Sequence, residues 1–192
     1  MKGGRETAPS ARAAEPAGSD MLTDRTRMRR HTVADFEQSA ALWSDPDVVR
    51  YISGKRSTRA ESWSRLLRYI GHWQALSFGY WVVEDRMTGQ FLGEVGLADY
   101  KRDMTPSIEK WPEIGWVLAP HAQGGGLATE AVAAALAWSD RMLTADRTMC
   151  LVDPDHAASI RVAAKNGFVE RCSGKLGGSP VLIMERLKPA AF

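Results

Sequence analysis

The feature that most constrains this chain is a strand, a glycine cluster and a helix that follow one another between residues 113 and 143. Residues 113–119 form an apolar run that Pro120 ends, which is typical of a strand. Gly124, Gly125 and Gly126 come next, and apolar residues then recur at helical spacing over residues 127–143. A strand that leads through a short turn into a helix predicts an α/β domain.

The glycine cluster predicts an anion-binding site at the start of that helix. Glycine has no Cβ, so a ligand can approach the main chain closely, and the first N–H groups of a helix have no partner within it. The helix dipole adds about half a positive charge at the same end, which suits a phosphate or a pyrophosphate. Judged on the glycines alone, a turn without any ligand is an equally good interpretation.

Two common nucleotide-binding loops do not fit these residues. A P-loop requires Lys followed by Ser or Thr directly after its last glycine, where this chain has Leu127 and Ala128. A dinucleotide-binding loop requires a different glycine spacing and an acidic residue that ends the next strand, whereas Asp146 precedes its strand. Phosphoryl transfer and dinucleotide binding are therefore disfavoured.

The other segments predict a mixed sheet that helices cover. Thr32 with Asp35 is a capping pair for a helix that Pro46 ends, and Thr58 with Glu61 is a capping box for a helix that extends through residue 73. A hairpin in the middle of the chain argues against a purely parallel sheet. Strands are expected at residues 22–30, 80–84, 91–97, 148–152, 168–172 and 180–187, a polar loop at 101–111, and a further helix at 156–166.

Length and composition indicate one domain with a tail. At about 150 residues per domain, 192 residues predict a single domain, placed at residues 21–192. Residues 1–20 are dominated by Ala, Gly, Pro and Ser and are expected to be disordered, which makes Met21 a candidate natural start.

Charge and hydropathy disfavour several classes of protein. The net charge is +2, and the one basic run, residues 25–30, is expected to be a solvated strand edge, so we expect neither a nucleic-acid nor a membrane partner. No stretch approaches the roughly 18 apolar residues of a membrane-spanning helix. Cys150 and Cys172 lack the spacing of a zinc site or a disulfide scaffold, which favours a reducing, cytoplasmic setting.

Two segments resemble the signatures of one superfamily. Residues 123–128 (QGGGLA) resemble the Arg/Gln-x-x-Gly-x-Gly/Ala signature of the GCN5-related N-acetyltransferases, and residues 155–168 resemble its Asn-x-x-Ser-x-Arg-x-x-x-Lys-x-Gly-Phe segment. Residues 26–30, 46–48 and 113–116 are similar to the RimJ/RimL branch, which acetylates protein N-termini. The resemblance extends over about residues 23–187.

This resemblance implies a fold and a cofactor site. The expected fold is a mixed, mostly antiparallel sheet flanked by helices, with a V-shaped opening between the strands at 113–119 and 148–152 that holds acetyl-CoA. No metal is expected. The residues expected to bind acetyl-CoA are Val117, Leu118, Ala119, Gln123, Gly124, Gly125, Gly126, Leu127, Ala128, Thr129, His156 and Ser159.

The implied reaction is the attack of a neutral amine on the thioester. An α-amino group has a pKa of about 8 and a lysine of about 10.4, so the acceptor arrives mostly protonated and needs a base. Glu113 is the first candidate for this base and Glu94 the second, each acting through water. Either residue is also compatible with an ordinary strand-end carboxylate that faces solvent.

Other groups would stabilise the intermediate and the leaving thiolate. The main-chain N–H of Val117 is the expected oxyanion donor, and Ser159 is the expected proton donor, unless its hydroxyl bonds back to a carbonyl of its own helix. The chain departs from the family pattern at Ala163 and Ala164, where many members have a tyrosine. It also has His156 in place of asparagine, which is compatible with a cofactor contact or with a surface or capping residue.

The acceptor is not encoded in a recognisable motif. The resemblance implies an N-acetyltransferase for a primary amine, either a protein N-terminus or a small molecule, chosen by loops such as residues 54–58 and 101–111. The alternative is a non-catalytic acyl-CoA-binding module, and a homodimer is compatible with either function. Trp63 and Trp73 are expected in the core, and Trp81, Trp111 and Trp116 at the acceptor pocket.

Overall fold

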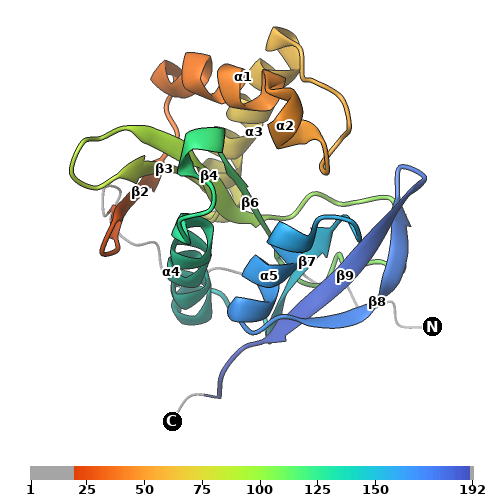
Figure 1. The fold of residues 1–192 in the computed structure, drawn as a ribbon. Coiled ribbons are helices and arrows are strands. Elements are labelled where there is room, and N and C mark those ends of the chain that lie inside the picture. The colour runs from red at the N-terminus through yellow and green to blue at the C-terminus, as the bar shows by residue number, and fades with distance from the viewer. Residues whose placement is uncertain (1–19, 191–192) are drawn as a thin grey trace.

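The computed structural model describes residues 20–190, so the tail predicted for residues 1–20 lies almost wholly outside the described residues. The strands form a single sheet with the order β1-β2-β3-β4-β6-β7-β9-β8-β5 (Figure 1). The strands are β1 (Met21–Leu22), β2 (Thr26–Arg30), β3 (Tyr80–Asp85), β4 (Phe91–Ala98), β5 (Met104–Thr105), β6 (Glu113–Leu118), β7 (Arg147–Val152), β8 (Val169–Leu176) and β9 (Ser179–Leu187). The helices are α1 (Phe36–Ser44), α2 (Pro46–Val49), α3 (Arg59–Leu76), α4 (Leu127–Met142) and α5 (Ala157–Lys165).

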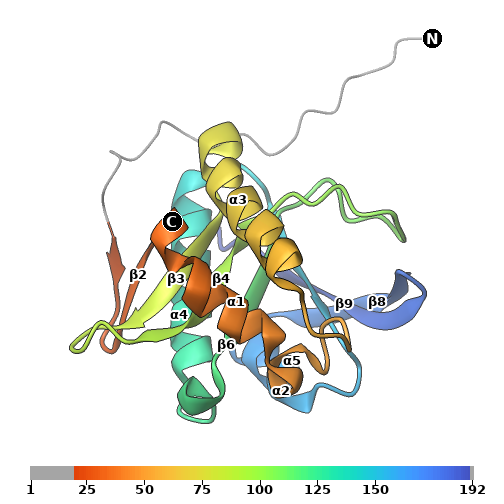
Figure 2. The same ribbon diagram turned by 90° about the horizontal axis from the view of Figure 1, so that it is seen from above.

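Helices cover both faces of the sheet. Figure 1 shows α1, α2 and α3 on one side and α4 and α5 on the other, and Figure 2 shows α1 and α3 side by side across the sheet. Alternation along β4 places Val95 and Leu97 in the core that includes α4. Leu92 joins the same core because the pairing of β3 with β4 shifts register between Val83 and Glu84, which reverses the alternation at that end of β4. Glu94 points to the opposite face, where its carboxylate meets α1.

The sheet is split at its parallel pair. All other neighbouring strands are antiparallel, whereas β6 and β7 are parallel and share a single register pair, Glu113 with Met149. By contrast, β6 pairs with β4 along its whole length, from Glu113 to Leu118. The predicted mixed, mostly antiparallel sheet with a V-shaped opening between these two strands is confirmed.

Local sequence signals account for most element boundaries. The predicted capping box of α3 is present, since the Glu61 N–H donates to Thr58 Oγ1 at 3.2 Å and the Thr58 N–H donates to Glu61 Oε2 at 2.7 Å. Pro46 ends α1 as predicted, but it also occupies the first turn of α2, whose N-terminus the Asp45 side chain caps. The prediction missed α2, and it missed β5 within the loop expected at residues 101–111. It also placed one strand at residues 22–30, where a turn at residues 23–25 separates the antiparallel strands β1 and β2.

Two tryptophans lie elsewhere than predicted. Trp63 was expected in the core but is 39% exposed and packs edge-on against Phe36. Trp81 was expected at the acceptor pocket, yet it is buried against Trp73 and Trp138 in the core beneath α4. The face of the sheet that a strand residue occupies depends on register, which local spacing does not reveal.

The basic run at residues 25–30 is not a simple solvated edge. Arg29 lies 2.6 Å from both Asp35 and Glu84, and these hydrogen-bonded carboxylates raise its pKa even though burial opposes the charge. Arg25 reaches across to the start of α4. These arginines therefore join β2 to neighbouring elements.

Candidate active site

A cleft of about 540 Å³ opens where β6 and β7 separate. The end of β6, the glycine loop, the first turns of α4 and α5, and the segment around α2 form its walls. All the residues predicted to bind acetyl-CoA line this cleft, except Ala119 and Gly125. The structure therefore brings together two segments, residues 117–129 and 156–159, that the sequence linked only through a resemblance.

The glycine loop is shaped by two left-handed residues. Gly124 and Gly126 both have φ of +81°, a region that is costly for residues with a Cβ, and Gly126 is the N-cap of α4. Because the loop enters α4 directly, the N–H groups of the first helical turn are left without carbonyl partners inside the helix. An anion in the cleft would meet these donors together with the positive end of the helix dipole.

Main-chain groups of β6 that face the opening belong to Trp116 and Leu118. The Met149 N–H donates to Pro112 O (2.9 Å), whereas the Ala119 N–H donates to Leu92 O on β4 (2.8 Å). Residues two apart on a strand point their N–H and C=O groups to the same side. Even-numbered residues of β6 therefore face β7 and odd-numbered ones face β4.

This alternation corrects one expectation. The N–H of Val117 was predicted to donate to the reacting carbonyl, but residue 117 directs its main-chain groups to β4, where its register partner is Glu94. The groups of Trp116 and Leu118 border the opening instead, and Leu118 O accepts a hydrogen bond from Gln123 Nε2 (2.9 Å).

The α5 wall carries His156, Ser159 and two cations. His156 is the N-cap of α5 but makes no side-chain capping bond, and its ring stacks on Tyr51 at a centroid distance of 4.6 Å. Burial lowers the pKa of His156, although Asp153 acts in the opposite direction. Ser159 lines the cleft in the first turn of α5, and Arg161 and Lys165 line it further along the same helix.

Tyr51 is a cleft residue that the sequence analysis missed. It lies two residues after the end of α2, lines the cleft together with Asp47, and reaches the opposite wall through its stack on His156. The family resemblance in this region covers residues 46–48, so it ends three residues before Tyr51 and gives no indication of this residue's role. Its contact with α5 is long-range, and local periodicity does not predict such contacts.

Neither predicted base lines the cleft. The Glu94 side chain has no solvent exposure; it accepts hydrogen bonds from Ser39 Oγ (2.7 Å) and Trp43 Nε1 (2.8 Å), and His31 Nε2 lies 3.5 Å from its Oε1. Desolvation acts to raise the pKa of Glu94, but the nearby His31 ring and the hydrogen bonds from Ser39 and Trp43 outweigh it and lower the pKa.

Glu113 is held in a two-point ion pair. Arg102 Nε donates to Glu113 Oε2 at 2.5 Å and Arg102 Nη2 to Oε1 at 2.6 Å, and Tyr100 lies beneath the same guanidinium at 4.6 Å. Glu113 is 7% exposed and marks the point where β6 and β7 part. Of the two carboxylates, Glu113 is therefore the one at the apex of the opening.

Of the other two tryptophans expected at the acceptor pocket, Trp116 on β6 lines the cleft, whereas Trp111, in the loop before β6, does not. Trp111 donates from Nε1 to Asp146 Oδ1 (2.9 Å), and the guanidinium groups of Arg147 and Arg171 lie within 5.1 Å of its ring.

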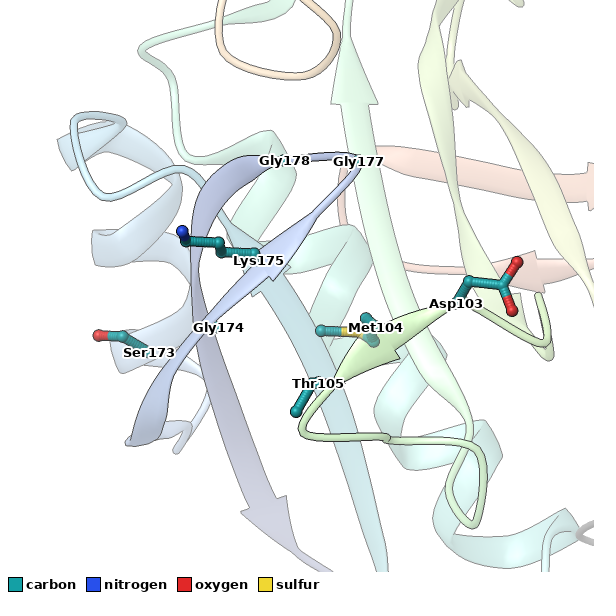
Figure 3. Close-up of a pocket in the computed structure, with 8 residues that line it drawn as sticks. All are labelled: Asp103, Met104, Thr105, Ser173, Gly174, Lys175, Gly177 and Gly178. Atoms are coloured by element: carbon teal, nitrogen blue, oxygen red, sulfur yellow. The ribbon is translucent and has the colours of Figure 1, made fainter.

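A second depression lies beside the loop expected to select the acceptor. It is an open groove of about 730 Å³ between β5 and the hairpin of β8 and β9 (Figure 3). Figure 3 shows Asp103 and Met104 on one side, and Lys175 with the turn at Gly177 and Gly178 on the other. The loop thus contributes a strand to the sheet edge and one wall of a groove.

Between residues 20 and 190, no helix combines the length and the apolar character needed to cross a membrane. Over the same residues, no group of three or more His, Cys, Asp or Glu side chains is arranged as a metal site.

Fold and site together define an α/β domain with a split sheet and a glycine-rich loop that enters a helix at the opening. The model of the acetyltransferase (GNAT) domain matches residues 25–169. The chain therefore belongs to the GNAT acetyltransferase family.

Individual relatives and solved structures are similar to most of this chain. The uncharacterized protein YkkB of Bacillus subtilis is 32% identical over 180 residues, which cover 88% of this chain and 96% of that protein. A solved structure from Bordetella pertussis, assigned to the GnaT acetyltransferase family, has 30% identity and a TM-score of 0.78, and covers 88% of this chain and 99% of its own. The spermidine N-acetyltransferase of Vibrio cholerae, solved with CoA and spermine, shares the fold at 20% identity and a TM-score of 0.67, with 86% and 97% of the chains covered.

The glycine loop generates a prediction about charge. We expect Gly124→Asp to weaken acetyl-CoA binding on the order of 100-fold, because it adds a negative charge to the part of the loop that lines the cleft. A Cβ at residue 124 would meet no other atom within 4 Å, so the side chain has room. Gly124→Asn is the matched control, since Asn has the same size and also tolerates the left-handed backbone. Isothermal titration calorimetry of both variants tests this prediction, and equal losses would show that strain, not charge, is responsible.

The buried carboxylate generates a prediction about stability. Glu94→Ala should lower the free energy of unfolding by about 3–5 kcal/mol at pH 7, because it leaves buried donors without an acceptor. The folded-state pKa of Glu94 lies below its ordinary 4.5, so its contribution is present above that value and is lost as the pH falls through the folded pKa. Urea unfolding should therefore show that the wild type has a higher free energy of unfolding than the variant, and that this difference shrinks in acid.

Glu37→Ala, which removes an exposed carboxylate of α1, is the control and should have little effect on the free energy of unfolding. A difference between wild type and Glu94→Ala that does not change down to acidic pH would contradict the account.

Proposed function

We propose that this protein is an acetyl-CoA-dependent N-acetyltransferase that transfers the acetyl group to a primary amine by direct attack on the thioester. The observation that carries the proposal is the glycine loop with its left-handed Gly124 and Gly126, placed at the mouth of the opening between β6 and β7. Family membership gives the class of reaction, and the cleft provides a place for a long, phosphate-bearing thioester.

Acetyl-CoA would lie along the unpaired edge of β6. Its pyrophosphate would accept hydrogen bonds from the main chain at residues 124–129, and Arg161 and Lys165 would add positive charge. The pantetheine amides would pair with main-chain groups of Trp116 and Leu118 in the manner of an added strand. In this arrangement the N–H of Trp116, in place of that of Val117, is the oxyanion donor.

Glu113 is the base in this mechanism, acting through water. It lies at the apex of the opening, and its negative charge favours removal of the proton from an ammonium group. Glu94, the second candidate, is enclosed by Ser39 and Trp43 and is assigned a structural role instead. The amine nitrogen then forms the new bond to the acetyl carbon, the C–S bond breaks, and the thiolate of CoA leaves.

Ser159 is the proton donor for this thiolate, and its hydroxyl takes a proton from water in the cleft as it gives one to the sulfur. The conjugate thiol has a pKa of about 8.5, so a weak acid at hydrogen-bond range suffices. Ser159 lines the cleft near the start of α5, whereas Ala163 and Ala164 occupy the positions at which many family members have a tyrosine.

The acceptor is a protein N-terminus, as in the RimJ/RimL branch, or a small-molecule amine. The structural neighbours include a ribosomal-protein-S5-alanine acetyltransferase and AAC(6')-Ib in complex with an aminoglycoside, so the shared fold is compatible with both classes. The groove at Asp103 and Lys175 is the candidate acceptor-selecting surface. Cys150 and Cys172 are free thiols, consistent with the proposed cytoplasmic setting.

A non-catalytic acyl-CoA-binding module is the second candidate. Two observations favour it: the α5 tyrosine of many relatives is replaced, and the Glu113 carboxylate is engaged by Arg102. Thiol release from acetyl-CoA, followed with a chromogenic thiol reagent against peptides with free N-termini, polyamines, amino acids and aminoglycosides, separates the two. Turnover with one class supports the transferase, and tight acetyl-CoA binding with silence across the whole panel supports the binding module.

The role of Glu113 can be tested by breaking its ion pair from either side. Glu113→Gln should lower kcat by about 100-fold and leave the KM for acetyl-CoA within about twofold, because it removes the base but no cofactor contact. Arg102→Gln breaks the same pair but keeps the carboxylate, so it should slow turnover much less. Steady-state kinetics with both variants is the measurement, and equal losses would indicate that the pair is structural.

The role of Ser159 can be tested against the other hydroxyl in the cleft. Ser159→Ala should lower kcat by roughly tenfold, while Tyr51→Phe, which keeps the stack on His156, should leave kcat within about twofold. The same steady-state assay decides between them. A loss confined to Tyr51→Phe would transfer the proton-donor role to Tyr51.

A further inference from the structure

A single arginine lies behind the glycine loop. Arg25 belongs to the turn between β1 and β2, and its Nη1 donates to the carbonyl oxygen of Gly125 at 2.8 Å. A Cβ built on Gly126 would lie 3.6 Å from Arg25 Nη2, so the guanidinium borders the loop at two successive residues.

The same arginine is fixed by the first turn of α4. Arg25 Nε donates to Glu130 Oε2 at 2.7 Å, and the Arg25 main-chain N–H donates to Glu130 Oε1 at 2.9 Å. Thr23 Oγ1 also donates to Glu130 Oε1, at 2.5 Å. Desolvation raises the pKa of Glu130, but the bonds from Thr23 and Arg25 outweigh it and lower the pKa, so the carboxylate is ionised at neutral pH. Arg25, Thr23 and Glu130 thus form one hydrogen-bonded unit, named here the loop clamp.

The bond to Gly125 controls a donor on the cleft side. The carbonyl of Gly125 and the N–H of Gly126 belong to one planar trans peptide group and point in opposite directions. When Arg25 holds the carbonyl, the N–H of Gly126 is directed away from Arg25. Gly126 lines the cleft and Gly125 does not, which agrees with this orientation.

A loop of three glycines is flexible unless a contact such as the Arg25 hydrogen bond restrains its backbone. Glycine loses more backbone entropy on ordering than any other residue, so an unrestrained loop would have to be ordered when the ligand binds. A contact that orders the loop beforehand improves affinity by removing that cost from the binding step.

We propose that Arg25 is a positioning residue for cofactor binding: through the loop clamp it aims the Gly126 N–H at the pyrophosphate of CoA and orders the glycine loop before CoA arrives. This inference rests on the proposed function, since it assumes that the loop binds CoA. Arg25 acts through the fork geometry of its guanidinium, which a lysine cannot reproduce.

The test compares three variants by calorimetry with two ligands. Arg25→Gln and Arg25→Lys should each weaken CoA binding by about tenfold, which corresponds to one displaced phosphate contact. Binding of pantetheine, which lacks the phosphates, should not change. Arg27→Gln is the matched control, because Arg27 lies two residues away with similar side-chain exposure (47% against 51%) and pairs with Asp20 instead of the loop.

Each outcome decides the proposal. Weakened CoA binding in both Arg25 variants, with normal binding in the Arg27 variant, supports it. Wild-type CoA affinity in Arg25→Lys together with weakened CoA binding in Arg25→Gln overturns the proposal, because charge attraction alone would then explain the effect. An equal loss of pantetheine affinity also overturns it, because the substitution would then have damaged the cleft in general. If Arg25→Gln fails to fold, Arg25→Lys with Glu130→Gln gives the same comparison. Failure of the wild-type protein to bind CoA would instead refute the proposed function.

Discussion

The rest of the site depends on how briefly β6 and β7 are paired. The two strands share one register pair, at Glu113 and Met149, and then diverge. Buried main-chain N–H and C=O groups are costly when they lack partners, so a strand that leaves its neighbour requires a substitute. On β6 the main-chain groups that need a substitute partner belong to Trp116 and Leu118. The Gln123 side chain is one such partner, since it donates a hydrogen bond to Leu118 O. An extended ligand that carries amides would supply the remainder.

The two ends of this opening have different chemistry. At the wide end, the glycine loop and the start of α4 form a place for negative charge, and Arg161 and Lys165 lie on the facing helix. At the apex, Glu113 and Arg102 form a charged pair of low exposure. A cofactor held by its phosphates at the wide end would direct its reactive end toward the apex. Glu94 lies away from the opening, because its hydrogen bonds join β4 to α1 within the protein.

Sequence reasoning succeeded where the physical signal is local. The capping box of α3 and the glycine-rich entry to α4 are set by neighbouring residues, and both were predicted at the correct positions. It failed where the outcome depends on residues far away in the chain. Helical spacing placed Trp63 on the apolar stripe of α3, but the packing of α3 against the sheet leaves this residue partly in solvent. Tyr51 and Arg25 were missed for the same reason, since each meets its partner only after the whole sheet has formed.

The central claim is that CoA lies along the free edge of β6 with its pyrophosphate on the glycine loop. A crystal structure of the protein with bound CoA tests it most directly. The account predicts phosphate oxygens within hydrogen-bond distance of main-chain nitrogens at residues 124–129, and pantetheine amides paired with Trp116 and Leu118. Phosphates bound away from the glycine loop, or a pantetheine arm that does not follow β6, would contradict it.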